Sequence, residues 1–312
     1  MQNNKQNIPI FLSADNNYAP FVATTIASIC DNTKSFCDFY VLDGGITDEN
    51  KEKICELKKT FSNFSIEFIK IDIEKYFKDF QETHYITKSM YSRFLIPELK
   101  PNIDKAIYSD VDVIVLGDIS KMYNEDLGEY ALGAVWEEYA EKSENINRKI
   151  NLNLPNEHKY FSSGNLLINC NLWRQNNIIK NLIQMTKNIN IKLDCPDQDI
   201  MNVFFANKYR ILDLKYCYRN QDIEYFKDEI SNIIIRHFNG KIKPWHINPQ
   251  YTHLYYPNAE KFWEYLKMTK FYENIYSKVQ NSKDQQHLQR LIKIEKLVIK
   301  NIKDKSIGKN ND

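Results

Sequence analysis

Two aspartates interrupt an apolar run, and this run constrains the chain more than any other stretch. Ala106–Leu116 reads AIYSDVDVIVL, and its β-branched and aromatic residues predict a β-strand. Side chains two positions apart in a strand point to the same side, so Asp110 and Asp112 should lie together. Carboxylates are costly to bury without a partner, and this pair suits a hard divalent ion such as Mg²⁺ or Mn²⁺ that could bridge a diphosphate. An Asp-X-Asp pair also arises by chance, so the residues elsewhere in the chain must show whether this pair binds a metal ion.

The elements expected before this run predict a parallel sheet. Ile8–Leu12, Phe39–Leu42 and residues 64–68 are short strands, by composition and by alternation. A helix from Pro20 and another capped by Thr47 separate them. The order β-α-β-α-β is typical of a Rossmann-like nucleotide-binding half. Such open sheets bind ligands at the carboxyl ends of their strands, which is where we expect the two aspartates.

The usual phosphate-binding loops are missing from the sequence. No G-x-G-x-x-G or P-loop pattern follows any expected strand, which argues against an ordinary dinucleotide fold and a kinase-like NTPase. A metal ion with basic side chains is the remaining way to hold a phosphate. A helix predicted over Thr87–Leu99 carries Arg93 beside Tyr91, Phe94 and Leu95. This setting favours a half-buried, ligand-facing arginine over a surface charge.

The middle of the chain alternates strands with polar segments. A strand is expected over Ala131–Trp136, followed by a polar stretch, Glu137–His158, that is long enough for a mobile lid or an acceptor-side loop. Tyr160–Gly164 leads into a strand over Asn165–Asn169, where the glycine either lets backbone approach a ligand or forms a turn. A helix is predicted over Leu172–Ile189.

Two later stretches carry surplus polar groups. The run CPDQD, residues 195–199, opens a helix predicted through Phe205; a cap explains one aspartate, which leaves Gln198 and a second carboxylate unexplained. An apolar strand predicted over Asn232–Phe238 ends at His237, shortly before Lys243. A histidine there is either structural or a third metal ligand beside a lysine that neutralises phosphate.

Composition excludes several classes of protein. With 312 residues and 43% hydrophobic content, the chain can bury a full core. It has no run of about 18 apolar residues and no signal-peptide pattern near its start, so we expect a cytoplasmic protein. Its six cysteines are scattered and predict reduced, structural thiols. Residues 281–312 hold eight basic and four acidic side chains, which leaves 34 basic against 37 acidic in the body and argues against nucleic-acid binding.

Six motifs, taken in order, make the chain resemble glycosyltransferase family 8. They are SADNNYAP, MYSRFLIP, YSDVDVIVLGDI, YFSSGNLLIN, PDQDIMN and HFNGKIKPWH, and they cover about residues 8–270. This family of retaining enzymes includes bacterial lipopolysaccharide galactosyl- and glucosyltransferases and glycogenin. The resemblance implies an α/β GT-A fold, with a Rossmann-like mixed sheet flanked by helices. It also implies a UDP-sugar donor and Mn²⁺ or Mg²⁺.

The resemblance also implies roles for particular residues, carried over by motif position. The metal ligands would be Asp110, Asp112 and His237. The donor would be bound by Asp15 and Asn17 at the nucleoside, by Gly240 and Lys243 at the diphosphate, and by Ser163. The catalytic residues would be Arg93 and Asp197, which hold the donor sugar, and Gln198, which lies near the anomeric carbon. One position departs from the pattern, because Ser162 stands where the family usually has asparagine. A hydroxyl lacks the second group of an amide, which affects which sugar is held.

These inferences predict a metal-dependent hexosyltransferase. It would move galactose or glucose from UDP-galactose or UDP-glucose to a saccharide acceptor, with retention, in lipopolysaccharide or lipooligosaccharide synthesis. Two other classes stay open: a metal-dependent phosphoesterase or nucleotidyltransferase using the same carboxylates, and a UDP-sugar-binding protein without turnover.

The end of the chain is predicted to be a basic amphipathic tail, residues 276–312, after a catalytic domain over residues 1–275. In a helical projection the tail has one apolar and one basic face. The apolar face holds Leu288, Leu291, Ile292, Val298, Ile299 and Ile302; the basic face holds Arg290, Lys293, Lys296, Lys300 and Lys303. Such a helix can lie on an anionic membrane, at the inner face of the cytoplasmic membrane and near a lipid-linked acceptor. The alternative is packing against the body or a second subunit.

Overall fold

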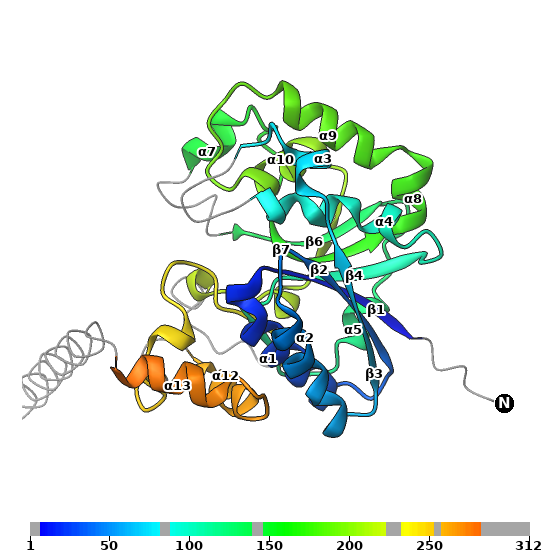
Figure 1. Ribbon diagram of the computed structural model, residues 1–312. Coiled ribbons are helices and arrows are strands. Elements are labelled where there is room, and N and C mark those ends of the chain that lie inside the picture. Colours follow the sequence, from blue (N-terminus) through cyan, green and yellow to red (C-terminus); the bar gives the residue numbers. More distant parts are fainter. Residues whose placement is uncertain (1–6, 82–87, 139–145, 223–231, 253–256, 282–312) are drawn as a thin grey trace, which may run out of the picture.

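The computed structural model describes residues 7–81, 88–138, 146–222, 232–252 and 257–281 (Figure 1). The strands in these ranges are β1 (Ile8–Ala14), β2 (Cys37–Asp43), β3 (Phe64–Lys70), β4 (Lys105–Ser109), β5 (Val113–Val115), β6 (Leu132–Trp136), β7 (Phe161–Asn169), β8 (Arg210–Leu212) and β9 (Ile235–His237). Among these residues a seven-stranded sheet has the order β3-β2-β1-β4-β7-β6-β8, and β5 pairs with β9 in a second, two-stranded sheet.

The pairing of the strands makes the sheet mixed. Strands β1, β2, β3 and β4 run parallel, whereas β7 is antiparallel to both β4 and β6, and β8 is parallel to β6. The parallel part confirms the predicted Rossmann-like half, and the whole confirms the mixed sheet. Because β7 runs backward, its first residues lie at the edge where β4 ends: Ser109 pairs with Asn165. Motifs far apart in the chain therefore meet at one edge.

Helices cover both faces of the sheet (Figure 1). Their bounds are α1 (Ala19–Asn32), α2 (Asp48–Cys55), α3 (Ile73–Phe77), α4 (Ile96–Leu99), α5 (Ser120–Tyr123), α7 (Ile146–Asn151), α8 (Cys170–Gln175), α9 (Ile178–Asn188), α10 (Pro196–Phe204), α12 (Ala259–Lys267) and α13 (Tyr272–Asn281). Short 3-10 helices are η1 (Asn16–Tyr18), η2 (Glu56–Lys59), η3 (Lys88–Leu95), η4 (Leu214–Tyr216) and η5 (Pro244–His246). One core packs α1, α2 and α12 on the sheet, and the other packs η3, α4, α8, α9 and α10.

The two cores explain the sequence of the central strands. In β1, Ile10 and Leu12 pack on the α1 side, and Phe11 packs in the opposite core. All three are fully buried, because a strand covered on both faces needs apolar residues at every position. Helix α2 begins as predicted, with the Thr47 hydroxyl accepting a hydrogen bond from Asn50 N at 3.4 Å.

The run Ala106–Leu116 is not one strand, so that prediction was wrong. It divides into β4 and β5, which belong to different sheets, and Asp110–Asp112 connects them. The break is held by tertiary contacts: Asp110 N donates to Gly164 O at 2.7 Å, and Phe238 N donates to Asp112 O at 2.8 Å. Because the backbone leaves the hydrogen-bonded sheet at this connection, both carboxylates lie outside the apolar core. This avoids the cost of burying them between two helix layers.

Other predicted bounds also change. The predicted helix over Thr87–Leu99 is η3 followed by α4, and Pro97 lies in the first turn of α4, where its missing N–H costs nothing. The predicted helix over Leu172–Ile189 is broken at Asn177, which has a left-handed φ of 52°. The strand expected over Asn232–Phe238 shortens to β9 and joins the two-stranded sheet.

The turn after β2 is built around the buried carboxylate of Asp43. Its Oδ1 accepts hydrogen bonds from Gly45 N at 2.8 Å and Ile46 N at 2.6 Å, and its Oδ2 lies 2.7 Å from Lys51 Nζ. Burial opposes the charge, but the contacts with Lys51 and the two amides lower the pKa of Asp43 below its ordinary value of 3.8. The charged form therefore stabilises the fold.

Asp43→Asn should lower the free energy of unfolding by about 1–2 kcal/mol at pH 7, since an amide cannot pair with Lys51. Folding lowers the pKa of Asp43, so the unfolded chain takes up the proton first. The stabilisation is complete above pH 3.8 and is lost as the pH falls through the folded pKa. Urea melts of both proteins at pH 7 and near pH 3 check this. A difference that stays constant or grows toward pH 3 would contradict it.

The predicted tail lies almost entirely outside the described residues, which end at residue 281. Helix α13 crosses the predicted boundary at residues 275 and 276 and buries Val279 in the α1 core. The division into a domain and a tail stays a prediction. Among the described residues, every helix is too short or too polar to cross a membrane.

Candidate active site

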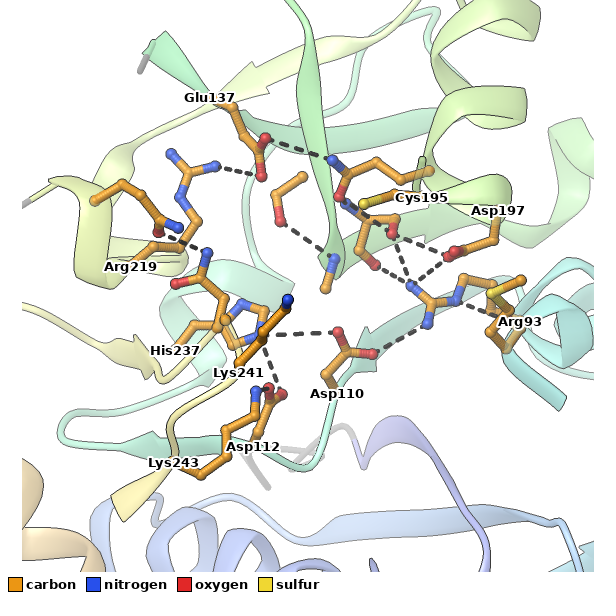
Figure 2. Close-up of a pocket in the computed structure, with 18 of the residues that line it drawn as sticks. Arg93, Asp110, Asp112, Glu137, Cys195, Asp197, Arg219, His237, Lys241 and Lys243 are labelled. Carbon is orange, nitrogen blue, oxygen red and sulfur yellow. Dashed lines mark hydrogen bonds and ion pairs between the residues drawn. The ribbon is translucent and has the colours of Figure 1, made fainter. Parts of the chain in front are cut away.

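The end of β4, the start of β7 and the end of β9 line a cleft of about 820 Å³. Nine of the predicted site residues line it: Arg93, Asp110, Asp112, Ser163, Asp197, Gln198, His237, Gly240 and Lys243. Figure 2 shows Asp110 between two groups of side chains, with His237, Asp112 and Lys243 on one side and Arg93 and Asp197 on the other. These nine residues come from five of the six motifs, which the structure therefore brings to one place.

Asp110, Asp112 and His237 form a cluster with metal-ligand geometry. One ligand atom from each lies within 4.8 Å of the other two. The His237 Nε2 atom is 3.0 Å from Asp112 Oδ1 and 3.9 Å from Asp110 Oδ2. The pairing of Val113 with His237 in the two-stranded sheet sets this approach. Two carboxylates and an imidazole fit Mn²⁺ or Mg²⁺.

Gly164 makes room for this cluster. A Cβ atom at Gly164 would lie 2.5 Å from His237 Cε1 and 2.8 Å from Asp110 Oδ2, closer than side chains approach one another. The glycine therefore serves close packing, since its backbone must pass directly against two of the three side chains of the cluster. Gly164 lies within β7, so it does not form a turn; the approach of its backbone to a bound ligand stays a prediction.

Two cationic side chains converge on the Asp112 carboxylate. Lys243 Nζ donates to Asp112 Oδ2 and to Phe238 O. Burial opposes the charge of Asp112, but Lys243 and His237 lower its pKa below the usual range. Burial would also lower the pKa of His237, whereas the charge of Asp112 raises it to about 10. The Asp112 carboxylate therefore attracts positive charge at the predicted metal site.

Arg93 links the carboxylate pair to helix α10. Its guanidinium lies 3.1 Å from Asp110 Oδ1 and 3.0 Å from Asp197 Oδ2, and it donates to Ser163 O at 2.7 Å and Ser163 Oγ at 2.9 Å. The ring of Tyr108 stacks against it, with 4.3 Å between the guanidinium carbon and the ring centroid. Arg93 is 6% exposed. Burial raises the pKa of Asp197 although the nearby Arg93 lowers it. Arg93 is therefore more deeply buried than the predicted half-buried position, and its contact with a ligand stays a prediction.

The largely buried side chain of Gln198 lines the cleft. Its Oε1 accepts a hydrogen bond from Ser163 N at 2.9 Å, and its Nε2 donates to Tyr160 OH at 3.2 Å and Glu137 Oε2 at 3.4 Å. The first turn of α10 presents Asp197 and Gln198 together, and Pro196 begins that helix.

Comparison with known proteins places this cleft in a family. The family model described as "Glycosyl transferase family 8" matches residues 9–248. The chain belongs to this family. It is 31% identical over 279 residues to general stress protein A of Bacillus subtilis, across 83% of this chain and 92% of that protein. It is 28% identical over 242 residues to the lipopolysaccharide 1,3-galactosyltransferase of Salmonella typhimurium, across 74% of this chain and 71% of that enzyme.

A solved galactosyltransferase structure shares the fold. The galactosyltransferase LgtC, in complex with donor and acceptor sugar analogs, superposes with a TM-score of 0.72 at 25% identity. The match covers 84% of this chain and 96% of LgtC. The mixed sheet with helices on both faces is therefore the GT-A fold, as predicted.

Two predicted donor-binding residues of this glycosyltransferase do not line the cleft. The Asp15 carboxylate accepts hydrogen bonds from Asn17 N at 2.8 Å and Tyr18 N at 3.2 Å, and thereby caps η1. Tyr18, which follows them, does line the cleft. A contact of Asp15 and Asn17 with a nucleoside stays a prediction. Ser162 lines the cleft, with its Oγ atom 3.8 Å from Cys217 Sγ.

Sequence reasoning missed several charged or hydroxyl side chains of the cleft region. The cleft is lined by Glu137, Arg148 and Arg219, and the Tyr160 hydroxyl accepts a hydrogen bond from Gln198 Nε2. The polar stretch expected to be a mobile lid or an acceptor-side loop contains Glu137 at its start and Arg148 in α7, while residues 139–145 lie outside the described residues. Glu137 follows β6 as Asp110 follows β4, so the same strand-end argument applied to it. Arg219 had no local pattern that would have indicated it.

Proposed function

We propose that this family 8 enzyme transfers galactose or glucose from UDP-galactose or UDP-glucose to a saccharide acceptor, with retention and with Mn²⁺ or Mg²⁺. The observation that carries the proposal is the joining of two groups of side chains through Asp110. Asp110 belongs to the Asp112–His237 cluster beside Lys243, and it pairs with Arg93, which reaches Asp197. A diphosphate and the sugar bonded to it require two such neighbouring subsites.

Breaking the sugar–phosphate bond creates negative charge on the UDP and positive charge on the sugar. A divalent ion held by Asp110, Asp112 and His237 would supply positive charge at the diphosphate oxygens. Lys243, from the same side, would neutralise the leaving phosphate further. Arg93 and Asp197 would orient the sugar hydroxyls, because one offers donors and the other acceptors in a buried pair.

Gln198 would present its carbonyl oxygen to the positive charge that develops on the sugar. A neutral amide is a weak nucleophile, so we favour attack by the acceptor on the face from which UDP leaves, through a short-lived ion pair. This route retains the anomeric configuration without a covalent intermediate.

The acceptor side of the proposal draws on the family. One relative is named as a lipopolysaccharide galactosyltransferase, which supports a lipopolysaccharide or lipooligosaccharide acceptor for this chain. Such an acceptor is lipid-linked, and the basic amphipathic pattern of residues 276–312 supports peripheral contact with the cytoplasmic face of a membrane. Co-sedimentation with anionic vesicles at low salt tests that contact.

The test of the function is UDP release from a panel of UDP-sugars with Mn²⁺, with and without a saccharide acceptor. We expect release from UDP-galactose or UDP-glucose that depends on the metal, and an α-linked product by NMR. Release of a free sugar phosphate would instead support the phosphoesterase class. Binding of UDP-sugars without any turnover would support the binding protein.

A further inference from the structure

The amide of Gln198 is held in one orientation by unlike neighbours at its two ends. Ser163 N, at 2.9 Å from Oε1, can only donate a hydrogen bond. The Glu137 carboxylate, at 3.4 Å from Nε2, can only accept one. Rotating the amide by half a turn would set its oxygen against the carboxylate and its NH₂ against an N–H. Both contacts would then be lost and replaced by repulsion.

Glu137 is itself held by a buried arginine. Its Oε1 lies 2.9 Å from the NH1 atom of Arg219, whose Nε and NH2 atoms each donate to Asp222 at 2.9 Å. Arg219 NH2 also donates to Trp136 O at 3.1 Å. Arg219 and Asp222 are 2% and 0% exposed. This anchor leaves the second oxygen of Glu137 directed at Gln198, while Arg219 keeps a charged partner of its own.

A second buried series of hydrogen bonds, beside the one through Glu137, reaches the same amide nitrogen. Tyr160 OH donates to Asp199 Oδ1 at 2.6 Å, so its oxygen is left to accept from Gln198 Nε2 at 3.2 Å. Asp199 Oδ1 also accepts from Arg148 Nε at 2.8 Å, and its Oδ2 accepts from the backbone at the start of α10. Both series of contacts therefore end on the NH₂ group of Gln198. One begins at Arg219 and the other at Arg148.

We propose that Glu137 and Tyr160 are positioning residues that hold the NH₂ group of Gln198 and so keep its carbonyl oxygen on the donor side of the cleft. This rests on the proposed function, in which that oxygen stabilises the positive charge on the sugar. An NH₂ group in its place would present a partial positive charge and raise the barrier. The orientation of the amide, and not only its presence, therefore sets the rate.

Two variants test this with little risk to the fold. Glu137→Gln keeps the shape and removes the carboxylate, and Arg219 retains Asp222. Tyr160→Phe removes the hydroxyl alone. Two matched controls are Glu129→Gln, at an exposed carboxylate outside the cleft, and Tyr209→Phe, which removes another largely buried hydroxyl that donates to Lys159 O.

Donor hydrolysis without an acceptor is the decisive assay. We expect kcat to fall about 10- to 100-fold in each test variant, with UDP affinity by calorimetry and Tm close to those of the controls. In a Gln198→Ala background, Glu137→Gln should then change the residual rate less than about twofold, because it acts through the missing amide. NMR adds a readout that is independent of turnover: the side-chain amide pair of Gln198 should shift or broaden in Glu137→Gln.

Other roles for Glu137 give different results, and each would overturn the proposal. If Glu137 binds the acceptor, hydrolysis stays at the wild-type rate and only the KM for the acceptor rises. If Glu137 only supports the fold, Tm and UDP affinity fall together and the loss persists in the Gln198→Ala background. The proposed function fails separately, through wild-type protein that releases no UDP or through a Gln198→Ala variant that hydrolyses the donor at the full rate.

Discussion

Asp112→Ala should remove most Mn²⁺ binding and lower kcat/KM for the UDP-sugar by roughly 10³-fold, since a metal ion supplies several kcal/mol of charge stabilisation. Asp112 is the member of the cluster on which His237 and Lys243 both converge. Its loss removes one proposed ligand and leaves Lys243 and His237 without their shared carboxylate. Titration with Mn²⁺, followed by electron paramagnetic resonance, measures the metal affinity directly. The same samples, with saturating Mn²⁺ added, give the rate of UDP release.

A matched control separates this effect from a general loss of charge. The Asp48 side chain is 98% exposed on α2, and Asp48→Ala should bind Mn²⁺ and turn over like the wild type. Near-UV circular dichroism of Asp112→Ala verifies that the aromatic packing is unchanged. Full activity with an unchanged Mn²⁺ requirement in Asp112→Ala would show that the metal site lies elsewhere.

Gln198→Ala should bind UDP with wild-type affinity and lose about 10²- to 10³-fold in kcat, the usual cost of removing one oriented dipole from a charged transition state. The side chain touches Ser163, Tyr160 and Glu137 but none of the three proposed metal ligands, so nucleotide binding should be spared. An equal fall in kcat and kcat/KM marks an interaction made only in the transition state. Calorimetry with UDP and Mn²⁺, beside steady-state kinetics, provides both quantities.

Gln175→Ala, at an exposed glutamine on α8, is the matched control and should match the wild type in both assays. Two results would count against the assignment. A rise in KM with unchanged kcat would make Gln198 a binding residue. A β-linked product from an α-linked donor would exclude the retaining route, in which the Gln198 carbonyl oxygen stabilises the positive charge on the sugar.

The sequence by itself determined the parallel half of the sheet and most of the site. Composition identifies β1 because a strand covered on both faces must be apolar at nearly every position, and the alternation of apolar and polar residues identifies the edge strand β3; both requirements are local. Asp110 and Asp112 were identified because two carboxylates in an apolar run need a compensating partner. His237 was identified because it lies at the end of another apolar run. These signals depend on neighbours within a few residues, so they can be read without a fold.

Only the tertiary structure decided where the apolar run breaks and what surrounds Gln198. The break between β4 and β5 depends on bonds to Gly164 and Phe238, which local propensity does not contain. Glu137 meets the Gln198 amide across 61 residues of chain, and no periodicity extends that far. The antiparallel course of β7 sets these distances, because it returns the chain to the edge where β4 ends. Close approach between distant segments is a property of the packed sheet, and a buried amide takes its orientation from those neighbours alone.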